Sequence, residues 1–480
     1  MSSVPERSKN AQQPGPAIAY SGYGRTAIPK TDDELTLAGP STPLGEYVRR
    51  FWQPVCMSSQ LRDVPLAIRI LNEDLVAFRD GSGEVAVMHR HCCHRGASLE
   101  YGIVQEHGIR CCYHGMHFAP DGTILDAPAE KDGGKRISAK LTQGAYPAFE
   151  RDGLVFAYMG PPEHRPPFIE YDAFEKYDDT RLVAFSNVFP CNWLQTMDNI
   201  SDQMHTSILH NPKRLYDREI PENLDWESYT LASFAAVPVL DYVAVRGGTA
   251  MAWIAGRRMS DERVWIRMNE LIVPNISQHA YLFEKGARRN LFHRVHMSRW
   301  YVPVDDTHSI IYGWRMFGKT IDPERKGDES KVGWDKMDFL DGQVGHRTYE
   351  DAQRMPGDWE AIVGQRPIAI HALENPLESD IGVFTLRKLV REAIRNRNPA
   401  ADPEAMHERA RNNKISNSYT QNTVLEIRRR PSEDEDRNLI KWVGRAIVDV
   451  MAEADSVDHL KRRDFVIARI SELEKTAATK

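Results

Sequence analysis

The sequence predicts an α+β fold in which a β-rich amino-terminal domain precedes a larger domain with an antiparallel sheet gripped by helices. At 480 residues the chain is longer than one ordinary domain requires, so two or three domains are expected. Short segments with a two-residue alternation dominate the chain up to about residue 165 and again over 229–317. A helical period returns from about residue 329.

Changes in composition predict the domain boundaries. Residues 1–45 form an amino-terminal arm and packing segment, whose first part is rich in Pro, Ser and Gly and is expected to be mobile. Residues 46–165 form the β-rich domain, and PPEHRPP (161–167) is typical of a linker. Residues 166–480 form the second domain together with the carboxy-terminal helices.

The elements of the β-rich domain follow from local signals. A short helix is predicted over 43–52, with Ser41 or Thr42 as its cap and Pro43 in its first turn. Turn-forming residues separate three short segments of strand character. These predicted strands are AIRIL (67–71), LVAFR (75–79) and EVAVMH (84–89).

The second domain mixes both periods. RLVAFSNVF (181–189) predicts a strand, and residues 192–210 predict a helix that Asn192 can cap. Seven alternating segments between 229 and 317, among them YTLASFAAVPVL and HAYLFEK, predict a large antiparallel sheet. Further helices are predicted at 389–396, 439–454 and 461–470, and the charged run 428–437 is interpreted as a solvated loop.

Charge and hydropathy exclude several classes of protein. Lys and Arg number 62 and Asp and Glu 68, so the net charge of −6 gives no excess of positive charge for nucleic acid or an anionic membrane. No apolar run approaches the length of a transmembrane helix, and the first residues lack the apolar stretch of a signal peptide. We therefore expect a cytoplasmic protein.

Four of the six cysteines lie in two loops that also carry histidines. Cys92 and His94 form a C-x-H pattern, and Cys111 and His114 form a C-x-x-H pattern. Two thiolates and two imidazoles can hold a [2Fe–2S] cluster, with the cysteines on one iron and the histidines on the other. The alternatives are a Cys2His2 zinc site, or buried cysteines with unrelated histidines. The cluster is favoured because zinc knuckles usually place both cysteines in one loop.

The doubled cysteines leave a choice of ligand. Cys93 adjoins His94, and only one residue separates Cys112 from His114, so neither keeps the loop spacing. We therefore expect Cys93 and Cys112 to pack beside the cluster rather than bind it. A glycine follows each histidine and would let the backbone approach bridging sulfides.

The predicted helix 192–210 suggests a second metal site. Asp198, Asp202 and His205 share one helix face, whereas His205 and His210 lie about 140° apart. The helix must therefore be distorted or end between the two histidines if both bind one metal. Two histidines and one carboxylate form a facial triad for Fe(II). The alternative is an amphipathic helix with ordinary polar residues.

The segments FWQPV, AFRD, CHRGASLEYG, GIRCCYHG and PDGTILDAPAE together resemble the Rieske non-haem iron oxygenases. The resemblance is strongest to the phthalate 4,5-dioxygenase branch, which includes aryl O-demethylases. Two positions depart from the family, with Cys93 where Pro is common and Met116 where Trp is common.

The resemblance implies the third iron ligand. It places the carboxylate on Asp358, whereas spacing alone would not select Asp358 over Asp351 or Glu360. The register is supported by residues that keep the family's spacing, namely Ile368, Glu374, Ser379 and Asp380.

The resemblance also implies a path for electrons. Asp202 would bridge the iron ligand His205 to His114 of the partner subunit, in a homotrimer or in stacked trimers.

The implied function is that of the terminal oxygenase in a multicomponent system. Because the chain shows no nucleotide or flavin motif, a separate reductase, with or without a ferredoxin, would supply electrons from NAD(P)H. With O2 the protein would hydroxylate or oxidatively O-demethylate an aromatic compound, for which we expect a carboxylated one. The alternatives are cis-dihydroxylation of a ring, an electron-transfer protein without catalysis, and a zinc-stabilised scaffold.

Overall fold

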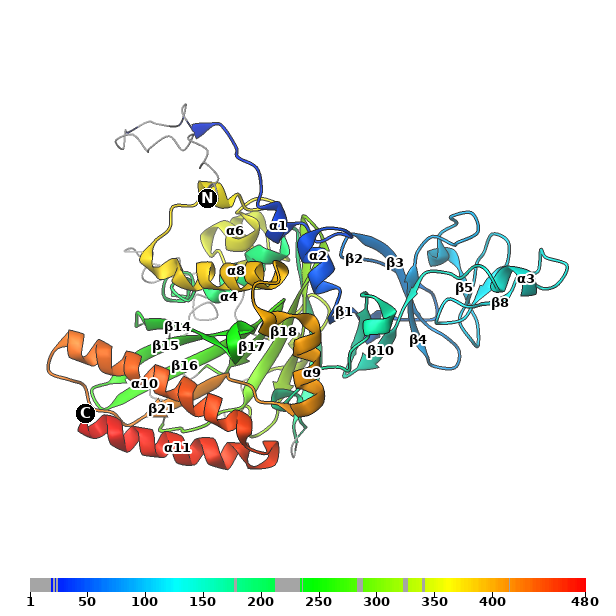
Figure 1. Ribbon diagram of the computed structural model, residues 1–480. Coiled ribbons are helices and arrows are strands. Elements are labelled where there is room, and N and C mark those ends of the chain that lie inside the picture. The colour runs from blue at the N-terminus through cyan, green and yellow to red at the C-terminus, as the bar shows by residue number, and fades with distance from the viewer. Residues whose placement is uncertain are drawn as a thin grey trace, which may run out of the picture.

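The computed structural model describes residues 25–480 together with residues 19 and 22, except residues 177–178, 212–233, 235, 283–287, 323–326, 339–341 and 414. A β-rich arm projects from a larger body of sheet and helices (Figure 1), which confirms the predicted fold class. Parts of three predicted segments, at 1–45, 229–240 and 279–285, lie outside the described residues. Within these limits no helix has both the length and the apolarity required to cross a bilayer.

The β-rich part contains three small sheets that follow the predicted strands. Thr42 caps α2 (Pro43–Val48) as predicted, because its hydroxyl accepts from the Gly45 N–H at 3.2 Å. The three sheets are β1–β11–β10 (Trp52–Met57, Leu154–Tyr158, Ala148–Arg151), β2–β3–β4–β9 (Leu66–Ile70, Glu73–Arg79, Val85–His89, Ala145–Tyr146) and β5–β6–β7–β8 (Ile103–Val104, Ile109–Arg110, His117–Phe118, Ile124–Asp126).

Two hydrophobic cores stabilise this part of the chain. The sheet β1–β11–β10 joins the core of the larger body, where the Phe156 and Trp300 rings lie 5.5 Å apart. The two predicted cluster loops belong to a separate core that includes Val76, Phe78 and Phe118. The loops are therefore anchored by apolar packing of their own.

An eight-stranded antiparallel sheet forms the larger body. Its order is β13–β19–β18–β17–β16–β15–β14, with β21 paired to β16. The strands are β13 (Arg181–Phe189), β14 (Val239–Val245), β15 (Ala250–Ser260), β16 (Arg263–Ile272), β17 (Ile276–Ala280), β18 (Val295–Asp305), β19 (His308–Phe317) and β21 (Gln421–Leu425). The prediction of a strand over 181–189 is confirmed.

The two faces of this sheet differ in chemistry. Ile254 and Gly256 of β15 pack against α10 (Glu433–Glu453), and α11 (His459–Thr479) lies against α10. The opposite face carries alternate residues such as Trp253 and Asn269, which face each other across β15 and β16. On that side lie α4 (Trp193–Ser201), α7 (Asp358–Val363) and α8 (Ile381–Ile394).

The helix predicted over 192–210 is shorter than expected. Asn192 caps α4 as predicted, but α4 ends at Ser201, and Asp202 is extended. The physical reason is local, because the Asp202 carboxylate accepts from the Met204 N–H at 3.0 Å and so replaces a helical hydrogen bond. Asp202 and His205 therefore do not share a helix face. His205 begins a separate 3₁₀ turn, η6 (His205–Ser207).

The interpretation of 428–437 as a loop is wrong for its second half. Ser432 caps α10 through a reciprocal capping box with Glu435, so the acidic residues from Glu433 onward form the first helical turn. Acidic side chains are favourable there because they face the positive end of the helix dipole. Asp436 also pairs with Arg258 of the sheet.

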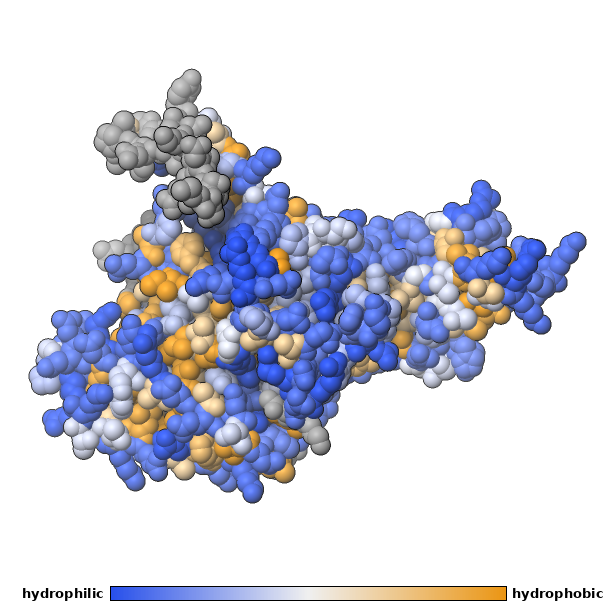
Figure 2. All heavy atoms as spheres, viewed as in Figure 1, coloured by the Kyte–Doolittle hydropathy of each residue, from blue (hydrophilic) through white to orange (hydrophobic). Residues whose placement is uncertain are grey.

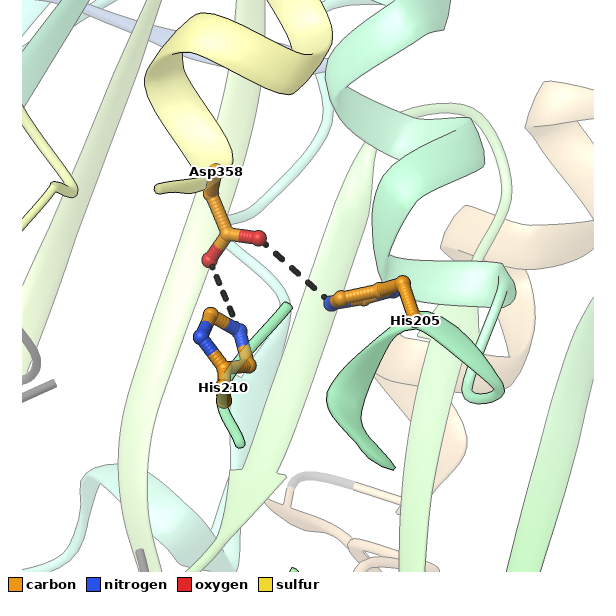
Figure 3. A group of neighbouring side chains, drawn as sticks. All are labelled: His205, His210 and Asp358. Atoms are coloured by element: carbon orange, nitrogen blue, oxygen red, sulfur yellow. Dashed lines mark ion pairs between the residues drawn. The ribbon is translucent and has the colours of Figure 1, made fainter. Parts of the chain in front are cut away.

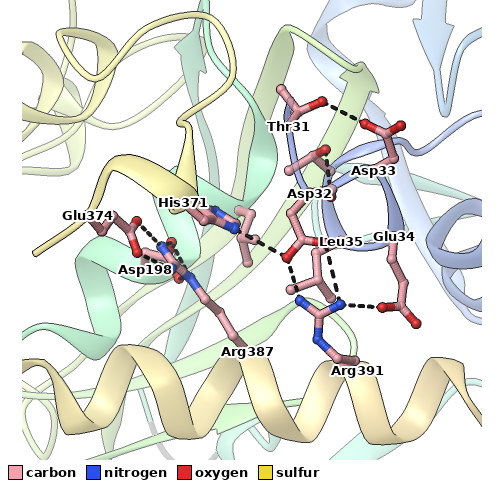
Figure 4. A network of polar contacts seen from close by, with 12 residues as sticks. Thr31, Asp32, Asp33, Glu34, Leu35, Asp198, His371, Glu374, Arg387 and Arg391 are labelled. Atoms are coloured by element: carbon pink, nitrogen blue, oxygen red, sulfur yellow. Dashed lines mark hydrogen bonds and ion pairs between the residues drawn. The ribbon is translucent and has the colours of Figure 1, made fainter. Parts of the chain in front are cut away.

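A buried ionic network fixes α8 against α4 (Figure 4). Arg387 donates from Nε to Asp198 at 3.1 Å and from Nη1 to Glu374 at 2.7 Å. Arg391 contacts Asp32 and Glu34 of the amino-terminal segment, which includes α1 (Asp33–Thr36). Burial raises the pKa of Asp198 in spite of the opposing attraction of Arg387.

Removal of Arg387 should destabilise the fold strongly. The variant Arg387→Ala would leave Asp198 buried without a counter-charge, so we expect the unfolding free energy to fall by about 3–5 kcal/mol. Urea denaturation followed by circular dichroism measures this loss. The matched control is Arg395→Ala, whose exposed pair with Glu34 should matter far less. Equal losses in the two variants would contradict this account of the network.

His407 should make the protein sensitive to acid. It lies in α9 (Pro403–Asn413), and both ring nitrogens are buried without a partner among the described residues. Burial lowers its pKa to about 4. Since the unfolded chain binds this proton near pH 6.5, stability should fall as pH decreases from about 6.5 towards 4. We expect His407→Phe to reduce that loss in urea titrations at pH 7 and pH 5. An unchanged difference between the two pH values would contradict the prediction.

Candidate metal centres

The two predicted cluster loops have the same backbone construction. In each loop the glycine N–H donates a hydrogen bond to the carbonyl of the cysteine four residues earlier. The distance is 2.9 Å from Gly96 to Cys92 and 3.1 Å from Gly115 to Cys111. Both glycines adopt positive φ, +74° and +72°, which is the left-handed region that other residues enter at a cost. The repeated geometry presents one cysteine and one histidine from each loop to a shared site.

The four predicted cluster ligands divide into an inner and an outer pair. Cys92 and Cys111 are buried, while the rings of His94 and His114 lie 4.7 Å apart towards the surface. This division is the one expected of a [2Fe–2S] cluster that has cysteines on one iron and histidines on the other.

The extra cysteines behave differently from each other. The Cys93 thiol contacts the Cys92 thiol, and this contact, with burial, raises the pKa of Cys92. Cys112 is exposed, so the expectation that it packs beside the cluster is wrong. Its position follows the C-x-x-H loop, in which the residue after the buried cysteine turns towards solvent.

Gln143 holds the first loop, a role that the sequence analysis missed. Its amide donates to the carbonyls of His89 and His91 at 2.8 and 3.1 Å, and its oxygen accepts from the Cys93 N–H at 2.8 Å. A buried glutamine far along the chain gives no local signal. The hydrogen bonds of Gln143 to the loop are evident only from the fold.

His205, His210 and Asp358 come together in the larger body (Figure 3). Nε2 of His205 lies 3.4 Å from Oδ1 of Asp358, and Nε2 of His210 lies 3.3 Å from Oδ2. His205 begins η6, and Asp358 begins α7. One ligand atom from each residue lies within 4.8 Å of the others. The early end of α4 thus resolves the angular conflict between the two histidines.

The protonation states suit a divalent metal. Burial lowers the pKa of His205 in spite of Asp358, so the neutral imidazole that binds metals is favoured. Burial opposes ionisation of Asp358, but the two imidazoles and Gln343 outweigh it and hold its pKa below the usual range. Two imidazoles and one carboxylate form a ligand set that fits Fe(II) with open positions.

Two amides orient the carboxylate. Gln343 donates to Asp358 Oδ2 at 2.6 Å, and Asn199 donates to Oδ1 at 3.2 Å. Gln195 of α4 also donates to the Ile362 carbonyl of α7 at 3.0 Å, which fixes the two helices relative to each other. No local sequence signal marks these three amides, because their partners lie on other elements.

The other acidic candidates lie outside this triad. Asp351 is exposed and binds Thr348 at the start of α6 (Tyr349–Arg354), and Glu360 pairs with Arg347. Asp202 is half-buried next to η6 and contributes its negative charge near His205. The two candidate centres are far apart along the molecule, because the cluster loops lie at the end of the arm (Figure 1).

Comparison with known proteins places the chain in a family. A model of the Rieske [2Fe–2S] domain matches residues 51–146. The oxygenase subunit of tert-butanol monooxygenase / tert-amyl alcohol desaturase from Aquincola tertiaricarbonis is 47% identical over 96% of this chain and 97% of that protein. Phenoxybenzoate dioxygenase subunit alpha from Ectopseudomonas oleovorans is 36% identical over 78% of this chain and 88% of that protein.

Solved structures support the fold. Dicamba monooxygenase bound to 3,6-dichlorosalicylic acid matches with a TM-score of 0.51 and 19% identity, over 73% of this chain and 99% of that chain. The predicted resemblance is confirmed by these relatives. The chain belongs to the Rieske oxygenases, as the oxygenase (alpha) component of an O2-using oxidoreductase system.

Proposed function

We propose that residues 46–165 hold a [2Fe–2S] cluster and residues 166–480 hold a single Fe(II). The cluster ligands would be Cys92, His94, Cys111 and His114, and the iron ligands would be His205, His210 and Asp358. The observation that carries the proposal is the convergence of two imidazoles and one carboxylate, with one ligand atom of each within 4.8 Å of the others. The first 45 residues serve as the packing segment.

The protein's own residues prepare the iron site. A bound Fe(II) would supply the one-electron and O2 chemistry, which amino acid side chains lack. Gln343 and Asn199 hold the Asp358 carboxylate in place. The triad lines one side of a cavity of about 50 Å³, and strands β15 to β18 line the other. Substrate held against the sheet would therefore face the open positions of the metal.

We propose that electrons cross between subunits of a homotrimer, alone or in stacked trimers. Exposed apolar side chains surround the cluster loops, and Figure 2 shows apolar atoms at that end of the arm. They are Tyr101, Ile103, Tyr113 and Leu125. A second exposed apolar group spans the segment before α8 and the first turn of α8. This turn lies against Ser201, the neighbour of Asp202, through Gly382. The second group consists of Leu373, Leu377, Ile381 and Phe384.

The apolar group at the cluster loops of one subunit would cover the apolar group at α8 of the next subunit. Repeated around the trimer, these head-to-tail contacts would close a ring. His114 of the partner subunit would then meet Asp202, which lies beside His205. Asp202 would orient the imidazoles on both sides and shorten the path between them.

The proposed reaction is hydroxylation or oxidative O-demethylation of an aromatic, carboxylated compound. The name of the relative at 36% identity supports an aromatic substrate. A separate reductase, with or without a ferredoxin, would deliver electrons from NAD(P)H. The cytoplasm is the proposed compartment, because its reducing conditions suit the six free cysteines.

A second candidate substrate class is a compact branched alcohol. The relative at 47% identity is named for tert-butanol and tert-amyl alcohol, which supports this class. A panel of aromatic acids, aryl methyl ethers and tertiary alcohols, supplied with ¹⁸O2 and a surrogate reductase, tests the proposal. A labelled phenol or alcohol, or formaldehyde from an ether, is expected. A doubly labelled cis-diol would instead favour ring dihydroxylation, and no O2-dependent product from the iron-loaded protein would contradict the proposal.

A further inference from the structure

Three buried arginines lie on the face of the large sheet that is turned towards the iron triad. They are Arg257 of β15, Arg267 of β16 and Arg299 of β18, with exposed fractions of 1%, 6% and 6%. The strand register places them on one face, because Arg257 opposes Trp265, and Arg267 lies two residues further along β16. Buried arginines are rare unless they are paired.

None of the three has a carboxylate partner among the described residues. Arg257 donates to the Ala236 carbonyl and to the Thr206 hydroxyl, both at 3.1 Å, and its Nη1 has no hydrogen-bond partner in the part of the chain that the structure describes. Among the described residues Arg267 donates only to the Ala280 carbonyl, at 3.3 Å, and its guanidinium group lies 5.2 Å from the Trp253 ring centroid, a cation–π contact that brings no negative charge.

Arg299 has the weakest acceptors of the three. It donates to the thioether sulfurs of Met297 at 2.9 Å and Met337 at 3.4 Å. A thioether is a poor acceptor, and the Tyr301 hydroxyl that also contacts Arg299 is neutral, so no described residue brings a carboxylate to this guanidinium group.

The other buried arginines among the described residues pair with a carboxylate, and so does the partly buried Arg246, which makes the contrast informative. Arg246 pairs with Glu270, and Arg315 pairs with Asp338. Burial opposes the charge of Arg246, but Glu270 outweighs it and raises the pKa, whereas burial lowers the pKa of Arg267 to about 9. Unpaired buried charge is costly, so its retention points to a ligand that supplies the missing negative charge.

Arg267 and Arg299 line the same small cavity as the triad. The cavity also contains Trp253, and Asp358 is the one carboxylate among its described lining residues. Fe(II) with one carboxylate ligand would leave a net positive charge, to which the two guanidinium groups add. Arg257 lies behind Arg267 and strengthens the positive potential there.

We propose that Arg267 and Arg299 form an anion subsite that binds the carboxylate of the substrate and directs the rest of the molecule towards the iron. A planar carboxylate matches the fork of donors on a guanidinium group. This inference rests on the proposed oxygenase function, and it adds the two residues that would bind the carboxylate of a proposed aromatic acid. A neutral tertiary alcohol would leave the subsite without its anion, whereas an aromatic acid or a branched hydroxy acid would fill it.

The test compares acids with uncharged amides of the same shape. The probes are benzoate against benzamide and 2-hydroxy-2-methylpropanoate against its amide, titrated calorimetrically into the cluster- and iron-loaded protein. We expect one acid to bind at least about tenfold more tightly than its amide. The variants Arg267→Met and Arg299→Met should remove that advantage, and Arg267→Lys should restore part of it because the charge returns.

Two controls separate this inference from the function on which it rests. Arg445→Met, an arginine of α10 beyond the other face of the sheet, should keep the preference for the acid. Iron content and the electron paramagnetic resonance signal of the cluster should be unchanged in every variant. If both centres are loaded but the wild-type protein does not favour either acid, or the arginine variants keep the preference, the subsite is overturned while the oxygenase function stands. Failure of the wild-type protein to bind iron would instead overturn the proposed function.

Discussion

Asp358→Ala should eliminate product formation, with a loss on the order of 10³-fold or more, while leaving the cluster intact. Asp358 is the anionic member of the triad and faces both imidazoles at 3.3–3.4 Å. Without it, two imidazoles alone would bind Fe(II) weakly. Iron and sulfide analysis should show about three irons per chain in the wild-type protein and about two in the variant.

Asp351→Ala is the matched control for this prediction. Asp351 is exposed on α6 and was an alternative that sequence spacing could not exclude. The control should keep three irons and normal turnover. If Asp351→Ala loses the third iron and Asp358→Ala keeps it, the assignment of the triad is wrong. Two irons in the wild-type protein would favour an electron carrier, and a colourless protein would favour a zinc scaffold.

Asp202→Asn should slow electron transfer without removing either metal centre. The amide is close in size to the carboxylate but lacks its charge, so it would hold the two imidazoles less firmly. We expect reoxidation of the dithionite-reduced cluster, in the presence of substrate and O2, to slow by about 10²-fold. Stopped-flow absorbance of the cluster measures this rate.

Glu378→Gln is a suitable control for the charge change at Asp202. Glu378 is exposed in the segment before α8, and Gly382 at the start of α8 lies against the Ser201 carbonyl. Its loss should leave the transfer rate unchanged. A normal rate in Asp202→Asn, or an equal decrease in both variants, would remove Asp202 from the path.

Local patterns predicted much of the fold. The strand at 181–189 and the caps Thr42 and Asn192 depend on residues that are neighbours in sequence, and the structure has them where they were expected. The two Cys–His loops are also local, because each is closed by a hydrogen bond between a cysteine and the glycine four residues later.

The failures arose where a side chain or a distant element overrides local propensity. The helix at 192–210 ends at Ser201 because the Asp202 carboxylate captures the Met204 N–H. Gln143 and Gln343 were missed because their partners are far away in sequence.

The sequence contains a signal for the anion subsite. In VWIRMNELIVP, Arg267 stands with Asn269 and Glu270 in a strand that is otherwise apolar. A charge at such a position is either paired or functional, but only the register of the sheet shows that Arg299 shares its face.

A hybrid protein tests the central claim that the two centres cooperate between subunits. His114→Ala should disable the cluster, and Asp358→Ala should disable the iron site, so each variant alone should be inactive. Co-expression would mix both chains in one ring, where an intact cluster can face an intact iron site of its neighbour. We predict about a quarter of the wild-type activity per chain from random mixing. Activity no higher than that of the separate variants, in rings shown to contain both chains, would contradict transfer between subunits.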